Sequence, residues 1–112
     1  MRLRLLLDGA DAVTVESLSV GSNLSITTCA IESLVSFQFK CRSLGVEQPD
    51  DADRAEADRF RQAFTDEVTR VDGLAADILT AWVRPIRYVC VAEVEQVFDQ
   101  TPGPRAGGAV TV

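Results

Sequence analysis

The feature that most constrains the fold is a stripe of apolar residues at helical spacing between residues 60 and 83. Steps of three or four residues separate its members, which places them on one face of an α-helix. The stripe consists of Phe60, Phe64, Val68, Val71, Ala75, Ile78 and Trp82. Pro49 with the aspartates that follow predicts a helix start, and Pro85 predicts the end. The pattern therefore predicts a helical region from about residue 51 to 83.

Gly73 leaves open whether this region holds one helix or two. A glycine in a helix interior costs roughly 1 kcal/mol relative to alanine, and it is also favourable just past a helix end. The stripe nevertheless keeps its phase across Gly73. An unbroken helix over residues 51–83 would be about 49 Å long, whereas a compact chain of this size has a radius of gyration of about 13 Å. Either the helix bends or splits at Gly73 and covers its own sheet, or one end projects and needs a partner.

Alternating apolar residues elsewhere predict about five strands. The clearest runs over residues 34–42, where Phe37 and Phe39 face one way and Gln38 and Lys40 the other. The remaining strands are expected over residues 2–7, 12–20, 24–31 and 86–98. The alternation slips near Ser17, which suggests a β-bulge. The last strand is apolar on both faces at its start, which is typical of the interior of a sheet.

These elements predict a single α+β domain over residues 1–100. We expect an antiparallel-dominated sheet of about five strands with one long or kinked helix packed on one face. Residues 101–112 are rich in Pro and Gly and predict a flexible C-terminal tail. The three cysteines are expected to be free and buried as small hydrophobes. The predicted core contains Leu5, Val15, Ile26, Phe37, Phe39, Phe64, Val68, Ile78, Trp82, Tyr88 and Cys90.

Composition argues against several classes of function. The chain has no histidine, the commonest general base and metal ligand. It also lacks a phosphate-binding glycine loop and the cysteine spacing of a zinc site, so we predict no catalytic residue, metal or cofactor, and no enzyme. The net charge of −6 disfavours direct binding to nucleic acid. No apolar run approaches the roughly 18–20 residues that span a bilayer, so no membrane association is predicted and a cytoplasmic location is favoured.

The densest acidic stretch is PDDADRAEADRFR, residues 49–61. Its carboxylates could imitate a nucleic-acid backbone, which would make the protein an acidic inhibitor that occupies a basic groove of its target. That acidic face would consist of Asp50, Asp51, Asp53, Glu56 and Asp58. Arginines interleave at i,i+3 and i,i+4, where they are expected to pair with the carboxylates. A solvated, self-paired face is the simpler interpretation, and inhibition stays as the alternative function.

Two aromatic residues in the first half of the predicted helix favour protein binding, because aromatic anchors dominate helix-in-groove contacts. The leading prediction is a small acidic, non-enzymatic protein-binding or assembly module. It would contact a protein partner or a second copy of itself through Phe60, Phe64 and Trp82.

Residues 35–84 run from the strand VSFQFKCRSL through an acidic linker to a helical segment that ends AADILTAWV. This order resembles the tail-assembly chaperones of tailed bacteriophages, in which an F-x-F-x-R strand precedes helices that end in a tryptophan-bearing motif. The chain departs from the family after Trp82, where Arg84 and Pro85 follow in place of a Gly/Asp turn. The resemblance covers under half of the chain and implies binding of a partner's hydrophobic segment during assembly.

Overall fold

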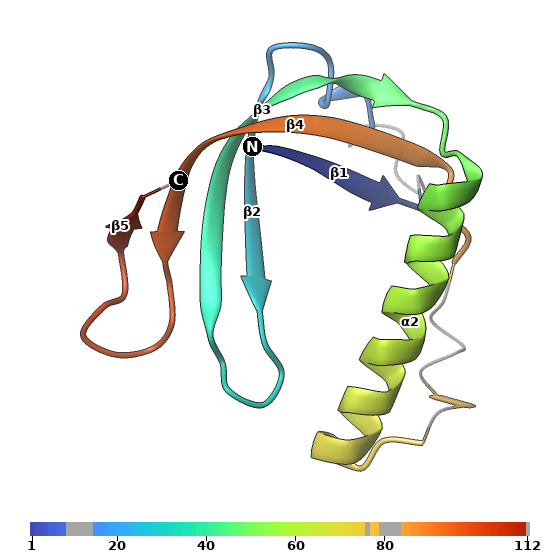
Figure 1. The fold of residues 1–112 in the computed structure, drawn as a ribbon, viewed down its shortest axis with the longest axis vertical. Coiled ribbons are helices and arrows are strands. Elements are labelled where there is room, and N and C mark those ends of the chain that lie inside the picture. Colours follow the sequence, from blue (N-terminus) through green and yellow to red (C-terminus); the bar gives the residue numbers. More distant parts are fainter. Residues whose placement is uncertain (9–14, 76, 79–83, 112) are drawn as a thin grey trace.

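The computed structural model describes residues 1–8, 15–75, 77–78 and 84–111. In that part of the chain the elements are β1 (Arg2–Leu7), β2 (Asn23–Cys29), β3 (Ser36–Glu47), α2 (Asp51–Asp72), β4 (Tyr88–Asp99) and β5 (Gly108–Val110). The five strands form one curled antiparallel sheet, and α2 stands beside it (Figure 1). This confirms the predicted α+β class, with about five antiparallel strands and a helix.

β4 is the central strand, in the order β1-β4-β3-β2. β3 runs along one edge of β4, while β1 pairs with the first half of the other edge and β5 with its last residues. Val89 and Cys90 point to opposite faces, and both are 0% exposed. The apolar character of both faces near residue 89 therefore predicted the interior position of β4 correctly.

The sheet curls where the pairing of β3 with β4 is irregular. The register shifts between Lys40 and Cys41 and again between Ser43 and Gly45, and such bulges bend a strand and increase its twist. Gly45 has φ 124°, a conformation that residues with a side chain rarely adopt. The curl gathers a buried cluster that contains Cys41, Ala92, Val94 and Val97. Partly buried residues packed against this cluster are Leu3, Leu5, Leu24, Ile26, Phe37 and Phe39.

Both ends of α2 follow from local sequence. The Asp50 carboxylate accepts a hydrogen bond from the Asp53 N–H at 2.8 Å, and the Asp53 carboxylate accepts one from the Asp50 N–H at 2.9 Å. This reciprocal pair is a capping box. At the other end Gly73 is left-handed, with φ 70°, and its N–H donates to the Thr69 carbonyl. The helix therefore ends at Asp72, which corrects the predicted boundary near residue 83.

Gly73 separates α2 from the rest of the predicted helical region. Residues 77–78 are helical again, and Ile78 is 47% exposed rather than part of the core. Trp82, the last residue of the predicted stripe, lies outside the described residues. The apolar stripe thus belongs to more than one element, although its spacing is continuous.

The strand expected over residues 12–20 is not formed in its described part, residues 15–20. Val15 and Glu16 are helical, and the Leu18 N–H closes a turn to the Val15 carbonyl at 3.1 Å. Leu18 is buried, and its carbonyl accepts a hydrogen bond from the Ser43 hydroxyl at 2.6 Å. The slip in alternation near Ser17 marks this turn and not a β-bulge.

Two further expectations are corrected in part. Within the segment expected to be a flexible tail, Gly108–Val110 form β5, and the Gly107 N–H donates to the Asp99 carbonyl at 2.7 Å. The glycines there permit a hairpin turn. Of the cysteines, Cys41 and Cys90 are buried, but Cys29 is exposed at the end of the edge strand β2.

Candidate functional site

An apolar groove of about 630 Å³ lies between α2, the end of β1 and residues 84–86. Its apolar lining consists of Leu6, Leu7, Ala57, Phe60, Phe64 and Ile86. Ala57 lies on the buried side of α2, and the two phenylalanines lie toward the open side. The groove therefore has a closed wall of aliphatic side chains and an open wall of aromatic ones.

Phe60 and Phe64 form that open wall together. They lie one helical turn apart, and their ring centroids are 5.9 Å apart with the planes inclined by 20°. Phe60 is 65% exposed and Phe64 is 43% exposed, although Phe64 was expected in the core. The structure thus brings two of the three predicted partner-binding residues into one groove, and the third, Trp82, lies outside the described residues.

The rim of the groove carries two charges of each sign, from Asp8, Glu56, Arg61 and Arg84. Arg61 donates to the Asp58 carboxylate at 3.2 Å and to the Arg84 carbonyl at 2.5 Å. This second bond connects α2 with the segment that forms the opposite wall. Because the rim has no net formal charge, the groove suits an apolar, uncharged segment.

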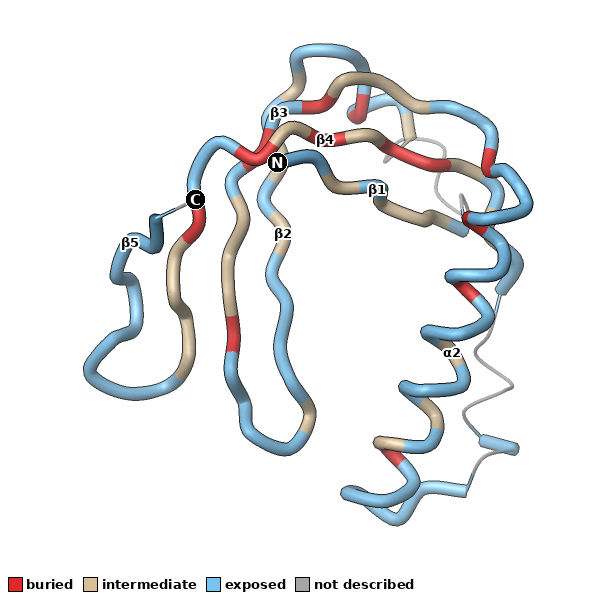
Figure 2. Tube along the Cα trace, viewed as in Figure 1, coloured by how far each residue is buried: buried red, intermediate tan, exposed pale blue. Residues whose placement is uncertain are grey.

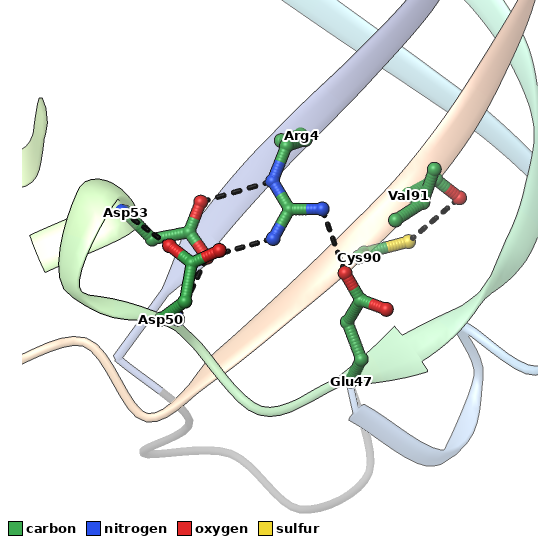
Figure 3. A network of polar contacts seen from close by, with 6 residues as sticks. All are labelled: Arg4, Glu47, Asp50, Asp53, Cys90 and Val91. Atoms are coloured by element: carbon green, nitrogen blue, oxygen red, sulfur yellow. Dashed lines mark hydrogen bonds and ion pairs between the residues drawn. The ribbon is translucent and has the colours of Figure 1, made fainter.

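A polar network fixes the first turn of α2 against the sheet (Figure 3). Arg4 on β1 donates from Nε and Nη2 to the two carboxylate oxygens of Asp53, at 2.9 and 2.7 Å, and from Nη1 to Glu47 at 2.6 Å. Asp53 is only 7% exposed. The hydrogen bonds from Arg4, followed by the one from the Asp50 backbone, hold the pKa of Asp53 well below its usual range. This network orients α2 and so positions Phe60 at the groove.

The same contacts account for most of the predicted acidic face. Four of its five carboxylates have partners within the chain: Asp50, Asp53, Glu56 and Asp58. Two ion pairs of this stretch, Glu56 with Arg59 and Asp58 with Arg61, form at i,i+3 spacing as the sequence predicted, whereas the expected i,i+4 pairing is not formed within residues 49–61. Asp51 lies exposed in the first turn, where a negative charge complements the helix dipole. The acidic segment therefore mainly caps the N-terminus of α2 and forms its solvent-exposed face.

Sequence reasoning missed the wall opposite the phenylalanines. Leu6 breaks the alternation of Leu3, Leu5 and Leu7, and this was the only local sign that the second face of β1 is covered. Ile86 was expected in the strand predicted over residues 86–98, which is β4 in the structure and begins at Tyr88. Arg4 had no sequence signal, because its partner Asp53 is 49 residues away.

Comparisons of the chain with protein-family models, curated proteins and solved structures found no match. No helix in the described part of the chain combines the length and apolar character required to cross a bilayer. Among those same residues no cluster of His, Cys, Asp or Glu is arranged to hold a metal ion.

Proposed function

We propose that the protein is a non-enzymatic binding or assembly module that holds an apolar segment of a partner protein in the groove beside Phe60 and Phe64. The observation that carries this proposal is the half-open aromatic pair on the wall of an otherwise aliphatic groove. Aromatic rings bury about 150–250 Å² each when they are covered, so they are effective anchors. The resemblance of residues 35–84 to tail-assembly chaperones supports the same kind of role.

The exposed surface of the whole chain also supports a partner. Its accessible area is 7496 Å², which exceeds by roughly 1,500 Å² the area of roughly 6,000 Å² expected for a folded monomer of 12.1 kDa. The radius of gyration is 15.4 Å, against about 13 Å for a compact chain of this length. One partner contributes about 800 Å² to a standard interface. Figure 2 locates much of the exposed surface along α2 and the β2–β3 hairpin.

Site-specific photo-crosslinking tests this proposal. The photoreactive amino acid benzoylphenylalanine replaces Phe60 in one protein and Val20, which is 75% exposed away from the groove, in a matched control. Irradiation in extracts of the cells that naturally make the protein should give a discrete cross-linked species for position 60 and none for position 20. A second substitution, Phe64→Ser, should reduce that species.

The mass of the cross-linked species identifies the class of partner. A species of twice the chain mass would mean that the groove binds a second copy, and any other discrete mass would mean a foreign protein. The proposal fails if position 60 gives no discrete species, or if positions 60 and 20 give the same set.

A further inference from the structure

β2 forms one edge of the sheet, with β3 on one side and no strand of the described chain on the other. Two hydrogen bonds set the pattern of its pairing with β3. The Ser43 N–H donates to Ser22 at 2.8 Å, and the Ala30 N–H donates to Val35 at 2.9 Å. The register between these two pairs is continuous, and hydrogen-bonded pairs alternate with non-bonded ones in an antiparallel ladder. The residues whose backbone groups point outward are therefore Asn23, Ser25, Thr27 and Cys29.

This edge lacks the features that normally prevent an edge strand from pairing. Across Asn23–Cys29 there is no proline, no charged residue and no bulge, and all four outward-pointing residues are exposed. The opposite edge of the sheet is formed by β1, which carries Arg2 and Arg4, and by β5, which has only three residues, and charges and short length both discourage pairing. The edge of β2 is thus the one prepared to accept a further strand.

The two faces of β2 determine which side chains an added strand must carry. Leu24 and Ile26 are half-buried and pack against the core cluster, so the residues placed beside them must be apolar. On the opposite face, the Lys40 ammonium lies 3.4 Å from the Ser25 hydroxyl, which brings a positive charge over the edge strand. Within the described chain Lys40 forms no ion pair. An acidic residue in the added strand would supply one.

A second copy of β2 does not meet these requirements. It carries no acidic residue, so it offers no ion-pair partner for Lys40. In Figure 1 α2 stands on the side of β2 away from β3, where a second sheet would meet it.

We propose that β2 accepts an extended segment of a partner protein, in which apolar and acidic residues alternate, as an additional strand of the sheet. Backbone hydrogen bonds at Asn23, Ser25, Thr27 and Cys29 hold the segment, and Leu24, Ile26 and Lys40 select its side chains. This site is separate from the groove at Phe60 and does not depend on the function proposed for that groove.

Amide hydrogen exchange followed by NMR tests this directly. The probe is the heptapeptide TVEVEVT with blocked ends, and the control is TVKVKVT, in which lysine replaces glutamate. Without peptide, the amides of Ser25 and Thr27 should exchange quickly and those of Leu24 and Ile26 slowly. Millimolar glutamate peptide should slow exchange at Ser25 and Thr27 by at least about tenfold and leave Leu24 and Ile26 little changed. The lysine peptide should have no effect.

Two variants test separately the backbone hydrogen bonds of β2 and the charge of Lys40. Thr27→Pro removes an outward N–H while the ladder to β3 keeps its bonds, so it should weaken binding of the glutamate peptide by at least about tenfold. Continued slow exchange at Ile26 shows that this variant is folded. Lys40→Met should abolish the preference for glutamate over lysine and leave the backbone pairing intact.

Three results would overturn the proposal. The first is no added protection at Ser25 and Thr27 with the glutamate peptide. The second is equal protection by both peptides with the native protein, which would remove the role of Lys40. The third is slow exchange at Ser25 and Thr27 without peptide that becomes fast on dilution, because the occupant would then be a second copy of the chain.

Discussion

Replacement of Phe60 by alanine measures how open the aromatic wall is in solution. Phe60 is 65% exposed, so about a third of its surface is covered. Complete burial of a large apolar side chain contributes about 1.5–3 kcal/mol, and a third of that is about 0.5–1 kcal/mol. The higher helix propensity of alanine offsets up to about 0.5 kcal/mol of this loss. We therefore expect Phe60→Ala to lower the free energy of unfolding by less than about 1 kcal/mol.

Urea unfolding followed by circular dichroism gives the comparison, with Val89→Ala as the reference for a core position. Val89 is 0% exposed on the central strand. Loss of two buried carbon atoms together with the cavity left behind should cost about 2–3 kcal/mol. The midpoint should shift clearly more for Val89→Ala than for Phe60→Ala, with the slope against urea unchanged in both.

A loss of about 3–5 kcal/mol for Phe60→Ala, the range for a fully buried phenylalanine, would refute the open wall. Repeating the measurement over a dilution series would then locate the covering surface. A cost that shrinks on dilution would place it on another copy of the chain, and a constant cost would place it within one chain.

Three further results are expected. Arg4→Met should weaken the dependence of stability on pH. The lowered pKa of Asp53 stabilises the fold at pH values above the unfolded pKa of about 3.9, and this stabilisation is lost as the pH falls toward the folded pKa. Thermal melts of both proteins from about pH 7 to about pH 2 measure this, and equal curves would contradict it. Gly73→Ala should cost about 1 kcal/mol in urea because φ is 70°, and Gly73→Asn should cost less; equal costs would remove the conformational explanation. In the native protein only Cys29 should react quickly with a thiol reagent, because the other two thiols are buried and burial raises the pKa of Cys41; three fast thiols would contradict the buried core.

Much of the fold was predictable because its signals are local. The apolar character of both faces near Val89 predicted a central strand, and the aspartates after Pro49 predicted the start of α2. Gly73 was recognised as a possible helix end, but the continuous stripe argued against that reading. The left-handed conformation at Gly73 settles it, since spacing along the sequence does not record the direction in which the chain leaves a helix.

The candidate site was predictable only on one side. Phe60 and Phe64 share a helical face whatever α2 packs against, so helical spacing was enough to pair them. The aliphatic wall depends on contacts between distant segments, as does the network of Arg4 with Asp53. Strand order and the curl of the sheet decide which segments come into contact. The periodicity of a single segment gives no information about either.

The way α2 is attached to the sheet explains why its aromatic face stays uncovered. Arg4 and Asp53 join its first turn to β1, and Arg70 joins its last turn to Glu32 in the β2–β3 hairpin at 2.6 Å. Ion pairs with exposed members orient an element but add little to stability. The sheet core must therefore supply most of the folding free energy, and the helix lies beside it with Phe60 and its neighbours largely unburied. Apolar spacing shows that a helical face needs a covering surface, and here Ala57 and Val68 of α2 are buried while Phe60 and Phe64 between them stay exposed.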